Sequence, residues 1–397
     1  MDLYLLDWVN FLLRWAHVIV AIAWIGSSFY FVFLDASLVE PTDAELRDKG
    51  VGGELWAVHG GGFYNPQKYL GAPKTLPEHL HWFYWESYST FLTGFALFTA
   101  IYVFQAGTFL VDPRVHAWTP AAAVACALAF LAVFWLGYDA ICRLFDQGSQ
   151  RIAGASIAAL VVVASWLACH LFAGRAAFVL VGAMMATTMS ANVFFWIIPG
   201  QRKVIAQMKA GEPVDPAHGR RARQRSVHNT YFTLPVLAAM LSNHYAFLHS
   251  APRNWIVLVT MMAAGALIRI SFVARHRARV LGKRVPWEYA GLGCALLAGL
   301  GVWQAPAPVA STVSAPAAPT FAQVRGIVKE RCSLCHNAQL ANKGIRLDAP
   351  DQILAHAPQM YQQAVVLKAM PLNNATQITE AERRVLKQWY EAGAHPD

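Results

Sequence analysis

The sequence predicts an all-α protein: a polytopic membrane bundle of about eight transmembrane helices, followed by a small C-terminal domain of soluble character. Apolar residues make up 56% of the 397 residues and charged residues only 14%, whereas soluble domains average about 25% charged residues. The apolar residues also gather in runs of about 20, the length that crosses a bilayer. These runs stop after Trp303, where the composition changes.

Eight apolar stretches are long enough to span a membrane as helices. Together they define a predicted transmembrane domain over residues 1–303. The stretches are Trp8–Leu34, Trp82–Phe104, Pro120–Ile141, Ile152–Leu171, Ala176–Ile198, His228–Leu248, Asn254–Arg275 and Trp287–Trp303.

Lys and Arg are unevenly distributed between the loops, and this predicts the orientation of the chain. The segments after the fifth and seventh stretches, GQRKVIAQMKAGEPVDPAHGRRARQR and RHRARVLGKR, are rich in both residues. We therefore expect these segments, and the loop over 35–81, in the cytoplasm. The N-terminus and everything after Trp303 would then lie outside. Loop charge also explains the net charge of +9, and no basic, aromatic-interleaved groove suggests a nucleic-acid partner.

The end of the chain divides into a linker and a tail domain. Residues 304–319, QAPAPVASTVSAPAAP, are rich in Pro and Ala and carry no charge, which is typical of an extended, semi-rigid linker. The tail, 320–397, has helix signals at both ends. TFAQVRGIVKERC places its apolar residues on one helical face, and a Thr379–Glu382 capping box opens a last helix that ends at Gly393.

Cys332 and Cys335 are two residues apart and are followed directly by His336. A redox dithiol of the thioredoxin type would need a βαβ unit, and the tail sequence shows no pattern of one. A zinc site would need a second Cys/His pair, but His356 and His395 are single. The remaining explanation is covalent c-type haem, in which the two cysteines form thioethers and His336 is an axial ligand of the iron.

Met370 is the predicted second axial ligand, because it lies downstream on a loop and is followed by Pro371. Met360 lies in a predicted helix, where packing explains it better. His/Met ligation raises the haem potential, so the tail is predicted to be a small cytochrome c domain that accepts electrons. Haem c is attached on the outer side of bacterial membranes, in agreement with the orientation that the loop charges predict.

Ionisable residues within apolar stretches are costly and mark candidate functional sites. His17, His170 and His244 lie at similar predicted depth near the outer side. They are candidate ligands of a second haem, a haem b, that would pass electrons to the cytochrome. The alternative is that they are ordinary interfacial histidines with local hydrogen bonds.

A second polar group lies near the predicted inner side. An arginine at membrane depth, Arg269, needs an anionic partner, which is either Glu86 or Asp139 in a structural ion pair or an anionic substrate. Candidate catalytic residues for proton transfer are Glu86, Asp139 and His81. The candidate substrate-binding residues are Arg269, Asn192, His228, Asn229 and Tyr231.

Four segments, RWAHVIVAIAWIGSSFYF, HWFYWESYSTFLTGFALF, MSANVFFWIIPGQRKVI and HNTYFTLPVLAAMLSNHY, resemble the membrane-bound bacterial urate oxidase (urate hydroxylase) family. Its members join an eight-span domain to a C-terminal cytochrome c. The resemblance implies that urate is oxidised to 5-hydroxyisourate in purine catabolism, with water as the oxygen source. It further implies that electrons pass through haem c, held by Cys332, Cys335, His336 and Met370, to a respiratory acceptor such as a terminal cytochrome oxidase.

The resemblance and the loop charges together predict a multi-pass protein of the bacterial inner membrane, with the N-terminus and the cytochrome domain in the periplasm. The alternative function is a non-catalytic, membrane-anchored cytochrome subunit that carries electrons for another dehydrogenase or from a quinol. The hydrocarbon core is about 30 Å thick. An inner urate site would therefore need a second cofactor between it and an outer haem, unless the pocket lies nearer the outer side.

Overall fold

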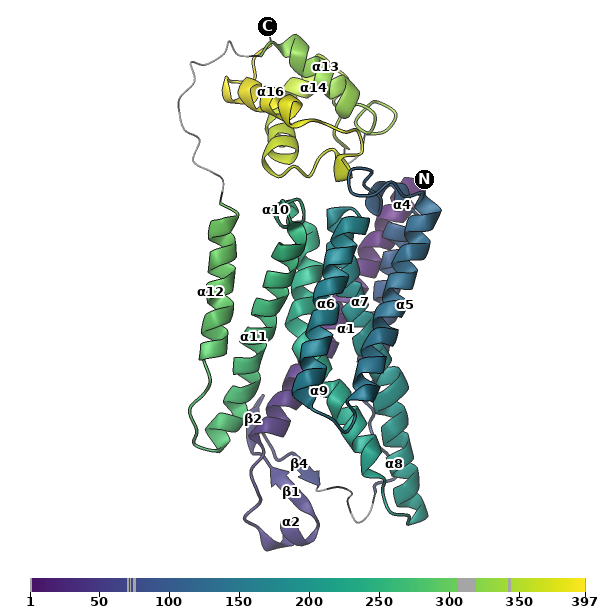
Figure 1. Ribbon diagram of the computed structural model, residues 1–397, viewed down its shortest axis with the longest axis vertical. Coiled ribbons are helices and arrows are strands. Elements are labelled where there is room, and N and C mark those ends of the chain that lie inside the picture. The colour runs from purple at the N-terminus through teal and green to yellow at the C-terminus, as the bar shows by residue number, and fades with distance from the viewer. Residues whose placement is uncertain are drawn as a thin grey trace.

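Long apolar helices dominate the structure, a computed structural model that describes residues 2–69, 71, 73, 76–305, 319–341 and 344–396. The helices run side by side in one bundle, and the tail lies beyond one end of it (Figure 1). Residues 306–318, most of the predicted linker, lie outside the described residues.

The helices of the bundle follow the predicted apolar stretches. Five segments are long and apolar enough to cross a membrane, namely Trp8–Ser37, Pro120–Leu144, Gln150–Leu171, Gly174–Ala210 and Asn254–Val280. This is consistent with a membrane protein, and the count of eight spans stays a prediction. The helices are α1 (Asp2–Ser37), α3 (Trp85–Phe98) with the π-helix η1 (Thr99–Val103), α4 (Ala106–Phe109), α5 (Pro120–Leu144), α6 (Gln150–Leu171), α7 (Gly174–Ala191) with the π-helix η2 (Asn192–Ile197), α8 (Ile198–Ala210), α9 (Pro216–Leu241), η3 (Ser242–His244), α10 (Ala246–His249), α11 (Asn254–Val280) and α12 (Glu288–Trp303).

The segment predicted as a long loop between the fifth and sixth stretches is mostly helical. Helix α8 continues to Ala210, and α9 begins at Pro216, well before the predicted start at His228. Lys, Arg, Gln and Ala are good helix formers even when they are polar. The connection is set by Gly211, whose φ of 68° ends α8, and by Asp215, which caps the N-terminus of α9.

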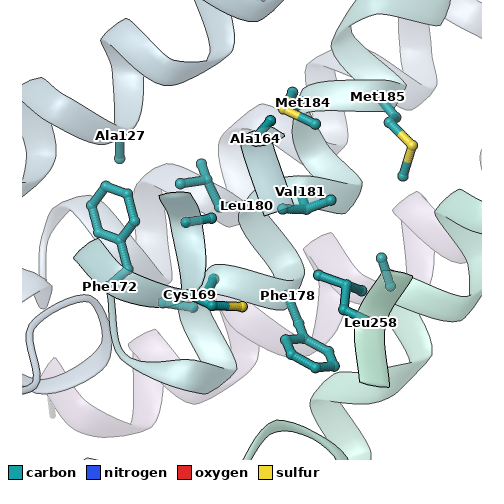
Figure 2. Close-up of a cluster of buried hydrophobic side chains, with 14 of the residues drawn as sticks. Ala127, Ala164, Cys169, Phe172, Phe178, Leu180, Val181, Met184, Met185 and Leu258 are labelled. Atoms are coloured by element: carbon teal, nitrogen blue, oxygen red, sulfur yellow. The ribbon is translucent and has the colours of Figure 1, made fainter. Parts of the chain in front are cut away.

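Helix α7 lies at the centre of the bundle and packs against α5, α6 and α9. Its core side chains are fully buried, and Figure 2 shows them between residues of α5, α6 and α11. Helix α9 approaches α7 closely at Gly182, where an added Cβ would lie 3.1 Å from that of Ala239. The buried side chains of α7 include Phe178, Leu180, Val181, Met184 and Met185.

Two small β-hairpins lie between α1 and α3, and the all-α prediction missed them. They follow α2 (Ala44–Asp48). Strand β1 (Val51–Glu54) pairs with β4 (Gln67–Tyr69), and β2 (Ala57–His59) pairs with β3 (Gly62–Tyr64). The turn between β2 and β3 uses Gly60 and Gly61 at positive φ, 56° and 82°, as a two-residue hairpin turn requires.

The tail folds around its own apolar core, which includes Val324, Leu386 and Trp389. The predicted capping box is present at Thr379, and Met360 is buried in a helix as expected. Helix η6, next to Met370 in sequence, lies against α4 of the bundle. The tail elements are α13 (Phe321–Arg331), α14 (Pro350–Ala355), α15 (Ala357–Met360), the π-helix η5 (Tyr361–Val366), η6 (Leu372–Asn374) and α16 (Glu380–Glu391).

A substitution at Gly293 tests how closely α12 packs on α11. A Cβ at this position would lie 2.8 Å from the carbonyl oxygen of Ala264, whereas a Cβ at Gly291 would meet nothing within 4 Å. We predict that Gly293→Ala destabilises the protein by about 1–3 kcal/mol through overpacking. Thermal unfolding in detergent measures the loss. Gly291→Ala is the control, and an equal effect of the two variants would contradict this packing.

Candidate functional site

A network of buried polar side chains joins α5, η2 and α9. The amide nitrogen of Asn192 donates to the hydroxyl of Tyr138 and to Oδ1 of Asn229, each at 2.9 Å. The Tyr138 hydroxyl also lies 2.9 Å from Nδ1 of His228, and Asn229 donates to the carbonyl of Met189. Asn192 begins the π-helix η2, and π-helical turns occur frequently at functional sites.

An ion pair lies beside this network. The side chain of Arg225 is only 1% exposed, and its Nη1 lies 2.8 Å from Oδ1 of Asp139. Asp139 also accepts from Nε of Arg143 at 2.6 Å and from the indole nitrogen of Trp196 at 2.8 Å. The guanidinium of Arg225 lies over the Trp196 ring, 4.5 Å from its centre. Its Nε has no hydrogen-bond partner within the described part of the chain.

A cavity of about 230 Å³ opens next to the ion pair. Among the lining residues, Asp146 forms an ion pair with Arg221 at 2.8 Å. The other two arginines of the lining, Arg143 and Arg225, give it a positive charge. A planar anion fits this chemistry, because guanidinium and amide groups can bind its edge and Trp196 can stack on its face. The lining residues are Cys142, Arg143, Asp146, Trp196, Arg221, Gln224 and Arg225.

Arg269 lies in a different environment. It is 6% exposed, its guanidinium lies 3.6 Å from the ring centre of Phe29, and its Nε and Nη2 lack partners in the described structure. Neither Glu86 nor Asp139 pairs with it among the described contacts, which leaves an anionic ligand as the other explanation considered for Arg269. A buried, uncompensated guanidinium is costly, which makes Arg269 a second place where an anion can bind.

The structure brings together some of the predicted site residues and separates others. Asp139, Asn192, His228 and Asn229 meet in the network. By contrast, His81 is exposed with its ring 4.6 Å from that of Phe83. Glu86 is half-buried in the first turn of α3, and Tyr231, half-buried on α9, makes no described contact with the network.

Sequence reasoning missed Arg225, Tyr138 and Trp196. Arg225 was counted as loop charge because it ends the basic run GRRARQR. The helical period gives a usable signal, since Arg225 lies three and four residues before His228 and Asn229 and therefore on the same face of α9. Nothing comparable marks Trp196, which the π-helix η2 turns towards Asp139.

The three histidines predicted near the outer side have separate local contacts. His17 lies 3.0 Å from the hydroxyl of Thr93. His170 is exposed and donates from Nδ1 to the carbonyl of Trp166, and His244 is exposed in η3. The described residues contain no group of three His, Cys, Asp or Glu that could hold a metal ion. The haem b ligand set stays a prediction.

The ring of His336 in the tail is held by a hydrogen bond from one of its two nitrogens. Its Nδ1 lies 3.1 Å from the carbonyl oxygen of Ile345. Because a carbonyl can only accept, Nδ1 carries the proton and Nε2 keeps its lone pair for a metal. Cys332 and Cys335 are both free rather than joined in a disulfide, so both sulfurs are available for thioether bonds.

The Met370 loop is fixed by backbone contacts at both sides of the methionine. The Met370 amide donates to the carbonyl of Gln363, and its carbonyl accepts from Arg383, each at 3.0 Å. The Met370 side chain is nevertheless 37% exposed, and the tail side chains Leu340 and Val366 are exposed too. A planar apolar group such as haem would cover side chains of this kind, and the haem c site stays a prediction.

A substitution at Asp139 tests the contribution of its ion pair with Arg225 to stability. Removing its charge leaves Arg225 buried without a counter-ion, so Asp139→Asn should destabilise the protein by about 3–5 kcal/mol. Arg143→Gln removes a partner that is 66% exposed and should cost at most about 1 kcal/mol. Unfolding followed by helical circular dichroism compares the two. Equal losses would show that Arg225 does not depend on Asp139.

Comparison with known proteins adds the family. Residues 3–305 match the family described as urate oxidase N-terminal. No curated protein and no solved structure matches the chain. The match covers the whole bundle, with the polar network, the ion pair and the cavity, and leaves out the tail. Since it spans more than half of the sequence, the chain belongs to the urate oxidase N-terminal family.

Proposed function

We propose that this protein is a membrane-bound oxidoreductase that converts urate to 5-hydroxyisourate and delivers the electrons to a haem c on its tail. Family membership supports urate as the substrate and oxidation as the reaction. The observation that carries the site is Arg225, a buried guanidinium with an unpartnered Nε beside a positively lined cavity. Urate is a planar monoanion at neutral pH, the kind of ligand that such a site selects.

Within the cavity, each residue has a distinct task in binding. Nε of Arg225 donates to a urate oxygen, and the Gln224 amide can bind a ring nitrogen or a second oxygen. The purine plane stacks on Trp196. Asp139 holds both Arg225 and Trp196 in place through the hydrogen bonds described above, so it acts as a positioning residue.

The reaction consumes urate and water and releases 5-hydroxyisourate, two protons and two electrons. The water oxygen forms the new C–O bond at the purine, and its protons must move to nearby bases. We assign this role to His228, because its Nδ1 lies 2.9 Å from the Tyr138 hydroxyl and 3.6 Å from the thiol of Cys142, which lines the cavity. The Tyr138–Asn192–Asn229 chain fixes the orientation of that histidine.

The tail residues supply the electron outlet. Haem c, when bound, provides a one-electron acceptor that works twice for each urate. Cys332 and Cys335 would hold it covalently, and His336 and Met370 would ligate its iron. From there the electrons pass to a respiratory acceptor in the periplasm, the side on which we place the tail.

The distance along the bundle calls for a redox group between the two sites. Asp139 lies 19 residues along α5 from Pro120, which is about 28 Å at 1.5 Å per residue, and the tail lies beyond the Pro120 end (Figure 1). Electron tunnelling falls steeply with distance. We therefore keep the haem b proposal for His17, His170 and His244.

A pyridine haemochrome assay of the purified protein tests this second haem. The proposal predicts both a c-type and a b-type signal. A c-type signal alone would remove haem b and would require the urate site to lie nearer the tail.

Urate should reduce the haem of the isolated protein without oxygen. We predict that adding urate anaerobically gives the spectrum of reduced haem c and that no hydrogen peroxide forms when air is admitted with an electron acceptor. Xanthine, which lacks the C8 oxygen, is the control ligand. Reduction by a quinol but not by urate would instead support the non-catalytic electron-transfer subunit.

Two arginine variants locate the urate site. Arg225→Gln, made together with Asp139→Asn so that no buried charge is left alone, should raise the KM for urate by roughly 10- to 100-fold, the value of a charged hydrogen bond. Arg269→Gln should leave the KM near that of the wild type. Haem content is measured for each variant as a folding control. The reverse pattern would move the site to Arg269.

A further inference from the structure

The hairpin formed by β2 and β3 carries an uncovered apolar face. Val58 and Phe63 lie opposite each other in the ladder. Leu55 donates to the carbonyl of Pro66, which continues the same register and puts Trp56 on the face of Val58. These three side chains, Trp56, Val58 and Phe63, are 68%, 71% and 78% exposed. We call them the hairpin face.

Such a face is unfavourable in water. Burying a large apolar side chain stabilises a protein by about 1.5–3 kcal/mol, and a lone two-stranded hairpin is marginal unless one face is packed. The segment Trp56–Tyr64 also carries no Asp, Glu, Lys or Arg, so charge does not keep the face soluble. Something outside the described chain therefore covers it.

The base of the hairpin is fixed to the helix bundle. Lys68, next to its base, forms an ion pair with Asp35 near the end of α1. Val39, just after α1, exchanges backbone hydrogen bonds with Glu54 at 3.0 and 2.8 Å. In Figure 1, β2 lies beside the end of α1 that is far from the tail, whereas α2 and β1 extend beyond it. The hairpin face is thus held near the level at which the apolar helices leave the membrane.

The residue types match that position. Trp and Tyr gather at the interface between lipid and water, and the hairpin face supplies Trp56. Trp85, the first residue of α3, is 62% exposed at the same end of the bundle. Phe83 packs on Phe31 of α1 and is itself half exposed. Together they form part of an aromatic belt.

We propose that the hairpin face inserts into the headgroup region of the membrane leaflet away from the tail and anchors the α1–α3 connection there. The lipid is the occupant of the face, in preference to a second copy of the chain or another protein. This inference does not rest on the proposed reaction. It assigns the glycine-rich turn a purpose, since a tight turn gives the hairpin a short, uncharged tip.

Depth-dependent fluorescence quenching tests this anchor in the full-length protein. Val58→Cys carries a bimane label in a Cys294→Ser background, in vesicles that contain lipids with a nitroxide near the headgroup. The parent without Val58→Cys gives the background, and Asp48→Cys on α2 is the aqueous control. We expect several-fold stronger quenching at position 58 than at position 48.

Equal or absent quenching at position 58 would overturn the proposal, including the case in which a second copy covers the face. Phe63→Cys repeats the measurement from the other strand if Val58→Cys does not fold. Its label should be quenched in the same way, and a label that stays unquenched there would also overturn the anchor.

Discussion

The buried ion pair between Arg225 and Asp139 is the interaction on which the rest of the bundle depends. A guanidinium that is 1% exposed among apolar helices needs a counter-charge in contact with it. Asp139 supplies this charge from α5 and so joins α5 to α9. Trp196 bonds the same carboxylate, which orients η2 and closes the wall of the cavity.

The ion pair also explains why the cavity can take an anion. Asp139 forms its ion pair with Nη1 of Arg225. Nε of the same side chain has no hydrogen-bond partner in the described structure. The pair alone is neutral, and Arg143 shifts the surroundings towards positive charge, because Arg221 is offset by Asp146. Arg269 differs, because no described carboxylate compensates it. Its contact with Phe29 stabilises the charge only in part.

Much of the fold could be predicted because its signals are local. Apolar runs marked the helices, and the Thr379 capping box and the Cys332–His336 motif are short patterns with direct chemical meaning. The site was predicted less well. Arg225 lies in a basic run that looks like a cytoplasmic loop, and only its tertiary contact with Asp139 makes it part of the interior. Trp196 depends on a π-helical turn, for which no simple sequence pattern exists.

The two hairpins could not be predicted from the sequence for a different reason. Their strands have only three or four residues, too few to show a period of two. Their stability depends on α1 and on whatever covers the hairpin face. Sequence patterns report one element at a time, whereas these elements exist through contacts with others.

The proposed function separates substrate chemistry and electron delivery along the length of the bundle. The cavity lies at the end of the bundle where α9 begins, and the tail lies at the other end, against α4 (Figure 1). Under the proposed function, this geometry would let the enzyme take urate on one side and release electrons on the other.

The most direct measurement is an electron cryomicroscopy structure of the protein in a lipid nanodisc with saturating urate. We predict density for one planar ligand in the cavity, stacked on Trp196 and within hydrogen-bond distance of Nε of Arg225. An empty cavity, with urate beside Arg269 or elsewhere in the bundle, would contradict it.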